Sequence, residues 1–185
     1  MYNVAYNSKS KGYKTHINKR LTKCYSTWRS MITRCYGNKN DAYSNCVVCT
    51  EWLDYQNFAE WYNENVYSIN ERLCLDKDFI GDSLMYSPTN CLLIPETLNK
   101  LVCNLKQKGS LPLGVSFHKG NNKYVSYLGT SKGRITLGYF DDITQAEECY
   151  IQAKETYVKD MIHTYEKLIP QDVYAKLLNF KLRRR

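Results

Sequence analysis

The chain has 185 residues and a formal net charge of +8, from 26 Lys and Arg against 18 Asp and Glu. It contains no apolar run of the roughly 18 residues that a membrane span needs, so we expect no membrane partner. Its first residues lack the apolar segment of a secretory signal, which excludes the exported classes and predicts a cytoplasmic protein.

The charge is distributed unevenly along the chain. Residues 1–50 carry 9 basic and 1 acidic residue, residues 51–105 carry 3 and 9, and residues 106–185 carry 14 and 8. Two basic segments therefore flank an acidic middle. Basic segments attract phosphate backbones by neutralising charge and releasing counterions, although the solvated Lys of an ordinary basic protein give the same balance. The distribution indicates double-stranded DNA as the partner to consider first.

The 8 Cys are too few for a disulfide scaffold in a chain of this length. Cys46 and Cys49, in "CVVC", have the spacing of half a zinc site, but no second pair of this kind follows. Because several Cys lie among apolar residues, where Cys behaves as a small hydrophobe, we expect buried free thiols in preference to zinc. Reduced thiols are typical of intracellular proteins.

The first elements are predicted from charge and apolar spacing. Residues 1–19 are basic and aperiodic, which indicates an N-terminal arm that is mobile or follows DNA. Apolar residues at helical spacing predict a helix from Arg20 to Tyr36. The run "CVVCTEW" at 46–52 then predicts a short strand, because it is rich in β-branched and aromatic side chains.

The middle of the chain is predicted to alternate between helices and short strands. Asp54 is placed to cap a helix. Residues 73–94 hold two short extended segments, and Pro95 then opens a further helix at its first turn. The stretch "KQKGSLP" at 106–112 combines charge, Gly, Ser and Pro, so it is the best domain boundary in the chain.

After this boundary the apolar period changes from 3.6 to 2, which predicts three strands at 113–119, 123–130 and 134–140. Asp142 and Gln145 form a helix-starting capping box, and a last short helix begins at Pro170. The apolar face predicted for the long helix consists of Ile143, Ala146, Tyr150, Ala153, Tyr157, Met161 and Tyr165. The predicted fold class is α+β, with an arm at 1–19, a domain at 20–105, a linker at 106–112 and a second domain at 113–185.

Three antiparallel strands backed by one helix leave one face of the sheet open. Alternation along the strands places Ser116, His118, Lys123, Tyr127, Arg134 and Thr136 on that face. A polar, basic and aromatic face of this kind is suited to a groove of DNA, although an ordinary solvated face has a similar composition.

The segment from 113 to 154 resembles the AP2 domain of plant transcription factors and phage homing endonucleases. The matching residues are Gly114–Val115, the aromatic Tyr124, "LGYF" at 137–140, and Ala146 and Tyr150 on the following helix. The resemblance implies that the sheet enters the major groove of DNA. The DNA-binding residues that it and the charged turns imply are Ser116, His118, Lys119, Lys123, Tyr127, Gly129, Lys132, Arg134 and Thr136.

The stretch from 75 to 99 resembles the core of ββα-metal (HNH) nucleases, especially the phage form "YSPxNC" at 86–91. The resemblance implies that Asp76 and Asn99 hold one divalent cation, and oxygen ligands suit Mg²⁺ or Mn²⁺. It also implies that Asn90 matches the residue that orients the general-base His of the family, and that Lys77 stands in place of that His.

Lys77 is a poor general base, because about 0.04% of an unperturbed Lys is neutral at pH 7. The carboxylates of Asp76 and Asp78 are expected to raise its pKa further, and Asp78 is at best a weak substitute as a base. The catalytic candidates are therefore Asp76, Lys77, Asp78 and Asn90, in a core that has lost its base.

Three functions remain open at the level of sequence. The first is a phage-type DNA-binding protein with an HNH-like core, an AP2 domain and weak or lost nuclease activity, which needs no cofactor. The second is an active, site-specific DNA endonuclease that uses Mg²⁺ or Mn²⁺. The third is an inhibitor that binds a host defence or DNA-metabolism protein. If the chain is phage-encoded, each would act in the cytoplasm of the host cell.

Overall fold

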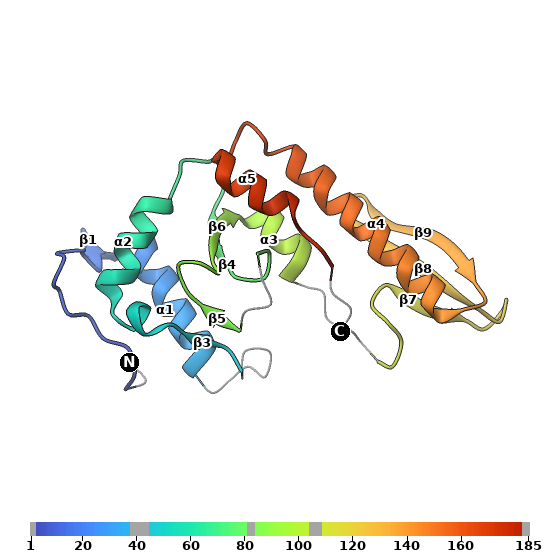
Figure 1. Cartoon of the computed structure of the whole chain (residues 1–185), viewed down its shortest axis with the longest axis horizontal. Coiled ribbons are helices and arrows are strands. Elements are labelled where there is room, and N and C mark those ends of the chain that lie inside the picture. The colour runs from blue at the N-terminus through green and yellow to red at the C-terminus, as the bar shows by residue number, and fades with distance from the viewer. Residues whose placement is uncertain (1–2, 38–44, 81–83, 104–108, 183–185) are drawn as a thin grey trace. The chain divides into compact units, whose positions relative to one another are not determined.

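The computed structural model describes residues 3–37, 45–80, 84–103 and 109–182. Within these residues it contains five α-helices and four small sheets (Figure 1), which confirms the α+β class. The chain divides into two compact units, residues 1–99 (unit 1) and 100–185 (unit 2), and each is described by itself. Residues 1–2 of the predicted arm, 106–108 of the predicted linker and 183–185 of the predicted second domain lie outside the described residues.

Unit 1 begins with a hairpin where the sequence predicts the end of an arm and the start of a helix. β1 (His16–Ile17) pairs antiparallel with β2 (Arg20–Leu21). The two turn residues, Asn18 and Lys19, have positive φ angles of 49° and 63°, as a two-residue hairpin turn requires. The predicted helix start at Arg20 is therefore wrong, because Arg20 pairs back across this turn.

α1 (Lys23–Tyr36) follows the hairpin directly. Thr22 caps it by accepting a hydrogen bond from the Tyr25 N–H at 3.1 Å. Its buried face consists of Cys24, Trp28, Met31 and Ile32, at the spacing that the sequence predicts. The Trp28 ring nitrogen donates to the Trp52 carbonyl at 2.7 Å, so α1 is fixed to the segment that precedes α2.

The predicted arm is docked on this segment along its described part. Tyr6 forms a bridge to Asp54, and the Ser8 N–H donates to the Asp54 carboxylate at 3.1 Å. Gln56 is fully buried and bonds both the N–H and the carbonyl of Tyr13. These long-range hydrogen bonds cannot be read from the composition of residues 1–19.

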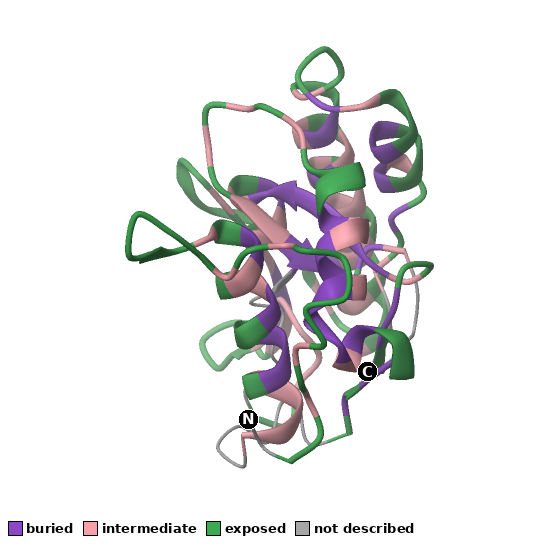
Figure 2. Cartoon of the chain, turned by 90° about the vertical axis from the view of Figure 1, so that its left-hand side faces the viewer, coloured by how far each residue is buried: buried purple, intermediate pink, exposed green. Residues whose placement is uncertain are grey.

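Next come η2 (Thr50–Leu53) and α2 (Tyr55–Asn65). Asp54 caps α2 by accepting from the Gln56 N–H at 3.1 Å, as predicted. The core of unit 1 is aromatic, and the rings of Trp52 and Phe58 meet edge to face at 5.0 Å. Figure 2 shows the resulting bands of buried and exposed residues along the helices.

Residues 73–95 contain three short strands, in place of the two extended segments predicted at 73–94. A fourth strand, at 47–48, pairs with one of them. β3 (Val47–Val48) pairs in parallel with β5 (Met85–Tyr86), and β4 (Leu73–Asp76) pairs antiparallel with β6 (Leu92–Pro95). β5 was missed because only two residues pair there, and their partner lies on a distant segment. α3 (Glu96–Cys103) follows β6 at once, so Pro95 ends a strand and does not lie in the helix.

Unit 2 contains an antiparallel sheet of β7 (Val115–His118), β8 (Lys123–Thr130) and β9 (Gly133–Phe140), in that order. All three strands were predicted. α4 (Ile143–His163) contacts each of them. Asp142 caps α4 by accepting from the N–H groups of Thr144 and Gln145 at 2.8 and 3.0 Å, as predicted.

The buried stripe of α4 differs from the predicted one after its second turn. It consists of Ala146, Tyr150, Lys154, Val158 and Ile162, whereas Ala153, Tyr157 and Met161 are only half-buried. The buried residues thus recur every four positions from Ala146 to Ile162 and include Lys154. α5 (Gln171–Leu178) lies against α4, where the Tyr174 hydroxyl and the His163 Nδ1 are 2.7 Å apart.

Candidate functional site

One face of the unit 2 sheet brings together the predicted strand residues. Ser116 lies opposite Val125, His118 opposite Lys123, Tyr127 opposite Thr136, and Gly129 opposite Arg134. Residues paired across antiparallel strands point to the same side, as do residues two apart along a strand. We call this side the open face: Ser116, His118, Lys123, Val125, Tyr127, Gly129, Arg134, Thr136 and Tyr139.

The helix covers the opposite side of the sheet. Ser126 and Leu128 point to that side and are buried, and Gly114 at the start of β7 approaches the Tyr150 ring of α4 so closely that a Cβ there would lie 2.1 Å from it. The exposed members of the open face are His118, Gly129, Arg134, Thr136 and Tyr139. The predicted Lys119 and Lys132 are exposed in the turns that follow β7 and β8.

Tyr139 belongs to the open face although alternation along the sequence does not place it there. A bulge shifts the register, so that Ser126 pairs with Gly138 while Tyr127 pairs with Thr136. One additional residue, Leu137, therefore stands in β9 and reverses the alternation beyond it. Counting from Arg134 in steps of two gives Gly138, whereas the structure exposes 50% of Tyr139 on this face.

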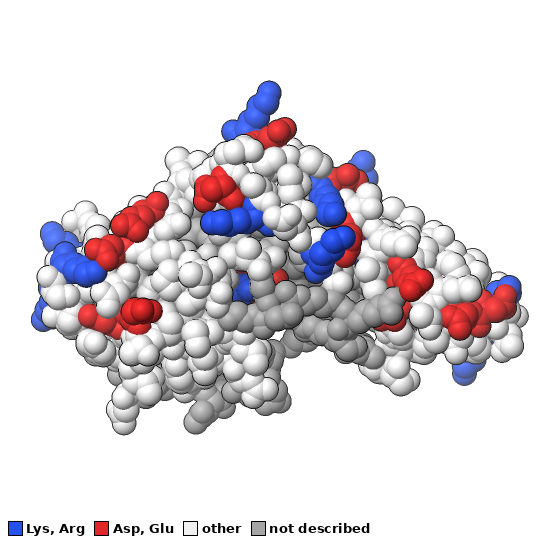
Figure 3. Space-filling view, viewed as in Figure 1, with Lys and Arg blue, Asp and Glu red and all other residues white. Residues whose placement is uncertain are grey.

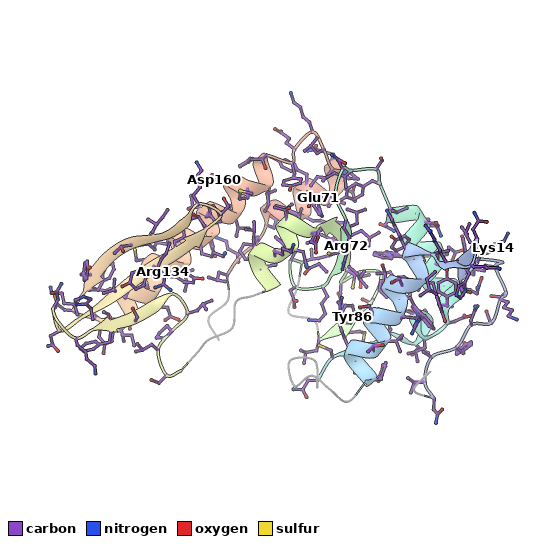
Figure 4. The ribbon with its side chains drawn as sticks, turned by 180° about the vertical axis from the view of Figure 1, so that it is seen from behind. Lys14, Glu71, Arg72, Tyr86, Arg134 and Asp160 are labelled. Carbon is purple, nitrogen blue, oxygen red and sulfur yellow. The ribbon has the colours of Figure 1, made fainter. Side chains whose placement is uncertain are left out.

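Aromatic rings lie against Arg134 and His118 on the open face. The Arg134 guanidinium lies 4.9 Å from the centre of the Tyr127 ring, and the His118 and Tyr139 rings meet edge to face at 5.8 Å. Figure 4 labels Arg134 on the sheet. Stacking orders the guanidinium and leaves its N–H groups available to acceptors such as phosphate or base edges.

The ββα segment, residues 73–103, holds the other predicted site, whose residues 76–99 lie in unit 1. Asp76 ends β4 opposite Leu92 of β6, and α3 is anchored where Glu71 accepts from the Thr97 N–H at 3.0 Å (Figure 4). The strand, loop, strand and helix thus follow one another directly along the chain. Asn99 lies half-buried in α3, and its three-residue distance from Glu96 places it in the first turn.

Asp76 is buried and its carboxylate closes a turn. Its Oδ1 accepts from the N–H groups of Asp78 and Phe79, both at 2.9 Å. Burial raises the pKa of Asp76 to about 6, although these two hydrogen bonds oppose the shift. A carboxylate held in this way serves the local backbone, whether or not Oδ2 has a second role.

Lys77 is engaged by neighbouring groups and is not a free base. Its Nζ lies 2.8 Å from an Asp78 carboxylate oxygen, and only 7% of its side chain is exposed. Burial lowers the pKa of Lys77, but the hydrogen bond and charge of Asp78, with the charge of Asp76, outweigh it and raise the pKa. The direction agrees with the sequence argument, so Lys77 is protonated at neutral pH.

Tyr86 and Arg34 are parts of this region that sequence reasoning missed. The Tyr86 ring is buried, with Lys77 Nζ 5.8 Å from its centre, and its hydroxyl lies 3.3 Å from an Arg34 nitrogen (Figure 4). Arg34 comes from α1, so no local pattern links it to this segment. Asn90 donates to the Met85 carbonyl at 3.4 Å, which holds the loop before β6.

The seven cysteines whose side chains the structure describes are free thiols: Cys24, Cys35, Cys46, Cys49, Cys74, Cys91 and Cys149. Burial raises the pKa values of Cys24, Cys35 and Cys91 to about 12, so these thiols are protonated and inert at neutral pH. No group of three or more His, Cys, Asp or Glu suited to a metal ion occurs among the residues that the structure describes. Across the same residues, no helix combines the length and apolarity of a membrane span.

No family model, no curated protein and no solved structure matches the chain.

Proposed function

We propose that the chain is a DNA-binding protein of the phage HNH/AP2 type, which contacts duplex DNA with the open face of unit 2. The observation that carries the proposal is the register of β7, β8 and β9. It gathers His118, Tyr127 and Arg134 on one side of the sheet, with α4 on the other. If the chain is phage-encoded, it works in the cytoplasm of the host.

The chemistry of the open face suits a groove lined by phosphates and base edges. Arg134 offers a planar set of donors held over Tyr127, and Arg is the side chain that most often reads guanine in the major groove. Lys119 and Lys132 stand in the turns at the ends of the strands. Cations placed there would contact the backbones that border the groove, which positions the sheet without reading sequence.

The test is fluorescence anisotropy with a labelled DNA duplex across a series of salt concentrations. Arg134→Ala should weaken binding by about 10-fold or more, because a good bidentate contact is worth about 1–3 kcal/mol. Lys167→Ala removes one exposed positive charge beyond the end of α4 and serves as the matched control. Equal affinities for the native chain and Arg134→Ala would refute a role for the open face.

For the ββα segment we propose a nuclease core that has lost its general base. The resemblance aligns Lys77 with the general base of the family, and Lys77 is paired with Asp78. A metal-dependent nuclease is the second candidate, because β4, β6 and α3 follow one another in the order of such cores. Asp76 Oδ2 and Asn99 would then hold Mg²⁺ or Mn²⁺, which would stabilise the leaving oxygen.

These two candidates differ in their action on supercoiled plasmid. With Mg²⁺ or Mn²⁺ the native chain should bind the plasmid without nicking it. Nicking by the native chain that is lost in both Asp76→Ala and Asn99→Ala would establish the second candidate instead. A thermal melt of each variant shows whether loss of activity reflects loss of the fold, because Asp76 also closes a turn.

A further inference from the structure

The β1–β2 hairpin of unit 1 projects its side chains into solvent on both sides. All six residues from His16 to Leu21 are exposed, including 60% of Ile17 and 43% of Leu21. His16 pairs with Leu21 on one side, and Ile17 with Arg20 on the other. Exposed apolar residues on so short a hairpin contribute no core, so its conformation is not explained by packing of its own side chains.

The base of the hairpin is nevertheless held firmly. The Tyr55 hydroxyl donates to the Lys14 carbonyl at 3.0 Å, and the Thr22 N–H donates to the Thr15 carbonyl at 2.9 Å. Thr22 also caps α1. The hairpin is therefore presented at a fixed position at the edge of unit 1, where β1 lies in Figure 1 and Lys14 in Figure 4.

The hairpin and the start of α1 carry Lys and Arg side chains, and the surrounding sequence has no acidic residue. Residues 1–40 contain no Asp or Glu. Lys11 pairs with Glu60, but no ion pair within the described residues involves the following exposed side chains: Lys14, Lys19, Arg20, Lys23 and Arg29. Figure 3 shows Lys and Arg at this edge of unit 1, with acidic side chains of neighbouring elements beside them.

We infer that this basic hairpin, with the first turns of α1, is a second nucleic-acid contact that binds the phosphate backbone of duplex DNA. The inference rests on the proposed function and extends it to unit 1, which has an acidic sequence elsewhere. Unpaired, exposed cations on a fixed scaffold bind phosphates at little cost in ordering, and they release counterions from DNA. No base-edge readout is assigned to the hairpin, because Lys and Arg at phosphates position a protein and carry no sequence information.

Charge favours DNA over a protein partner at this surface. The central positions of protein interfaces are depleted in Lys, whereas this hairpin has Lys14 at its base and Lys19 in its turn. Its two apolar side chains point to opposite sides, so they form no joint apolar patch. A protein that used the hairpin would be sensitive to Ile17 and Leu21, while DNA would be sensitive to the cations.

The test compares two triple variants of the full chain in the anisotropy assay. Lys14→Gln/Lys19→Gln/Arg20→Gln removes three charges from the hairpin. Lys167→Gln/Lys176→Gln/Lys181→Gln removes three from the region around α5 and is the charge-matched control. The hairpin variant should bind DNA about 10-fold or more weakly, and its log–log salt slope should be shallower by about 0.9 for each lost phosphate contact. Both variants should melt as the native chain does.

Each result has a definite meaning when Arg134→Ala is measured alongside. Native affinity and salt slope in the hairpin variant, with weakened Arg134→Ala, overturn the inference and leave the proposed function in place. Equal weakening by both triple variants also overturns it, since net charge alone would then account for the effect. A weakened hairpin variant with normal Arg134→Ala supports the hairpin and refutes the open face. No DNA binding by the native chain overturns both.

Discussion

Asp76 and Lys77 at the predicted site of unit 1 are tied to their neighbours, whereas Arg134 on the open face of unit 2 extends into solvent. In unit 1, Asp76 accepts two backbone N–H groups, and Lys77 is paired with Asp78 and almost fully buried. In unit 2, Arg134 is exposed and rests on one ring, that of Tyr127. Groups that are already satisfied internally have little left to offer a ligand, while the exposed groups keep their donors.

Because of this difference, substitutions at the two sites should affect different properties, stability at one and ligand affinity at the other. Removing one partner of a buried polar pair leaves a desolvated group without compensation, which costs the fold. Removing an exposed cation costs the fold little and affects only what binds there. Substitutions in the ββα segment should therefore change the free energy of unfolding, and substitutions on the open face should change affinity.

The largest effect on stability is expected where unit 2 holds its sheet against α4. Gly114 has a φ of +75°, and a Cβ there would lie 2.1 Å from the Tyr150 ring. Gly114→Ala should destabilise the fold by about 3 kcal/mol, from a left-handed backbone penalty and overpacking. Gly109→Ala is the matched control: its φ is +89° with no atom within 4 Å, so it should cost about 1–2 kcal/mol. If urea unfolding gave the same loss of unfolding free energy for Gly114→Ala and Gly109→Ala, the close approach of Gly114 to Tyr150 would not contribute to the cost.

The second prediction compares an ion pair of unit 1 in which one partner, Lys77, is buried with an exposed pair of unit 2. Asp78→Ala should destabilise the fold by about 2 kcal/mol, because Lys77 stays buried without its partner. Lys77→Met removes the buried charge itself and should stay within about 1 kcal/mol of the native chain. Asp141→Ala breaks the exposed pair with Lys123, whose atoms are 3.1 Å apart, and should cost less than about 0.5 kcal/mol.

Equal losses for Asp78→Ala and Asp141→Ala would contradict this comparison. They would mean that Lys77 reaches water when Asp78 is removed, and so remains available for chemistry. The measurement is the midpoint of urea unfolding at constant slope.

The sequence predicts the local features and misses those that depend on distant partners. The caps at Asp54 and Asp142 are confirmed because the capping residue and the N–H groups it accepts lie within three positions. The three strands of unit 2 follow from alternation and turn residues. The hairpin at Asn18 and Lys19 escapes notice because its turn lacks the Gly that marks most turns with positive φ.

For the candidate sites the same limit applies. Alternation identifies most of the open face, but the bulge at Leu137 inverts it and hides Tyr139. The contact between Arg34 and Tyr86 joins residues 52 positions apart, and no spacing rule reaches that far. The docking of residues 6–13 on Asp54 and Gln56 is equally invisible in a segment whose composition resembles a disordered arm.

The third prediction concerns Lys154, a buried cation on the covered side of unit 2. Its Nζ lies 5.8 Å from the centre of the Tyr157 ring and pairs with no carboxylate among the described residues. Burial lowers the pKa of Lys154 below its ordinary 10.5. Lys154→Met should therefore stabilise the fold by about 1 kcal/mol at neutral pH, because it keeps the packing and removes the desolvated charge.

The gain in stability from Lys154→Met should depend on pH in a direction that the lowered pKa fixes. Below the pKa that Lys154 has in the folded protein, its side chain is charged in both the folded and the unfolded state. The fold then bears the full cost of desolvating that charge. Between the lowered folded pKa and 10.5 the unfolded chain binds the additional proton, so the native chain gains stability as pH rises. The advantage of Lys154→Met should shrink over that window. Lys167→Met, at an exposed position, should show no such trend, and a constant advantage would contradict the assignment.

The smallest effect is expected at two serines on opposite sides of the sheet. Ser126 is fully buried, and its hydroxyl has no hydrogen-bond partner, whereas Ser116 is half-buried on the open face. A desolvated hydroxyl without a partner destabilises the fold, so Ser126→Ala should stabilise it by about 0.5–1 kcal/mol in urea unfolding. Ser116→Ala should leave stability within about 0.5 kcal/mol and act only on DNA affinity. A loss of stability in Ser126→Ala would show that its hydroxyl has a hydrogen-bond partner such as a water. The buried polar groups on the covered side of the sheet would then be hydrogen-bonded, as Asp76 is in the ββα segment.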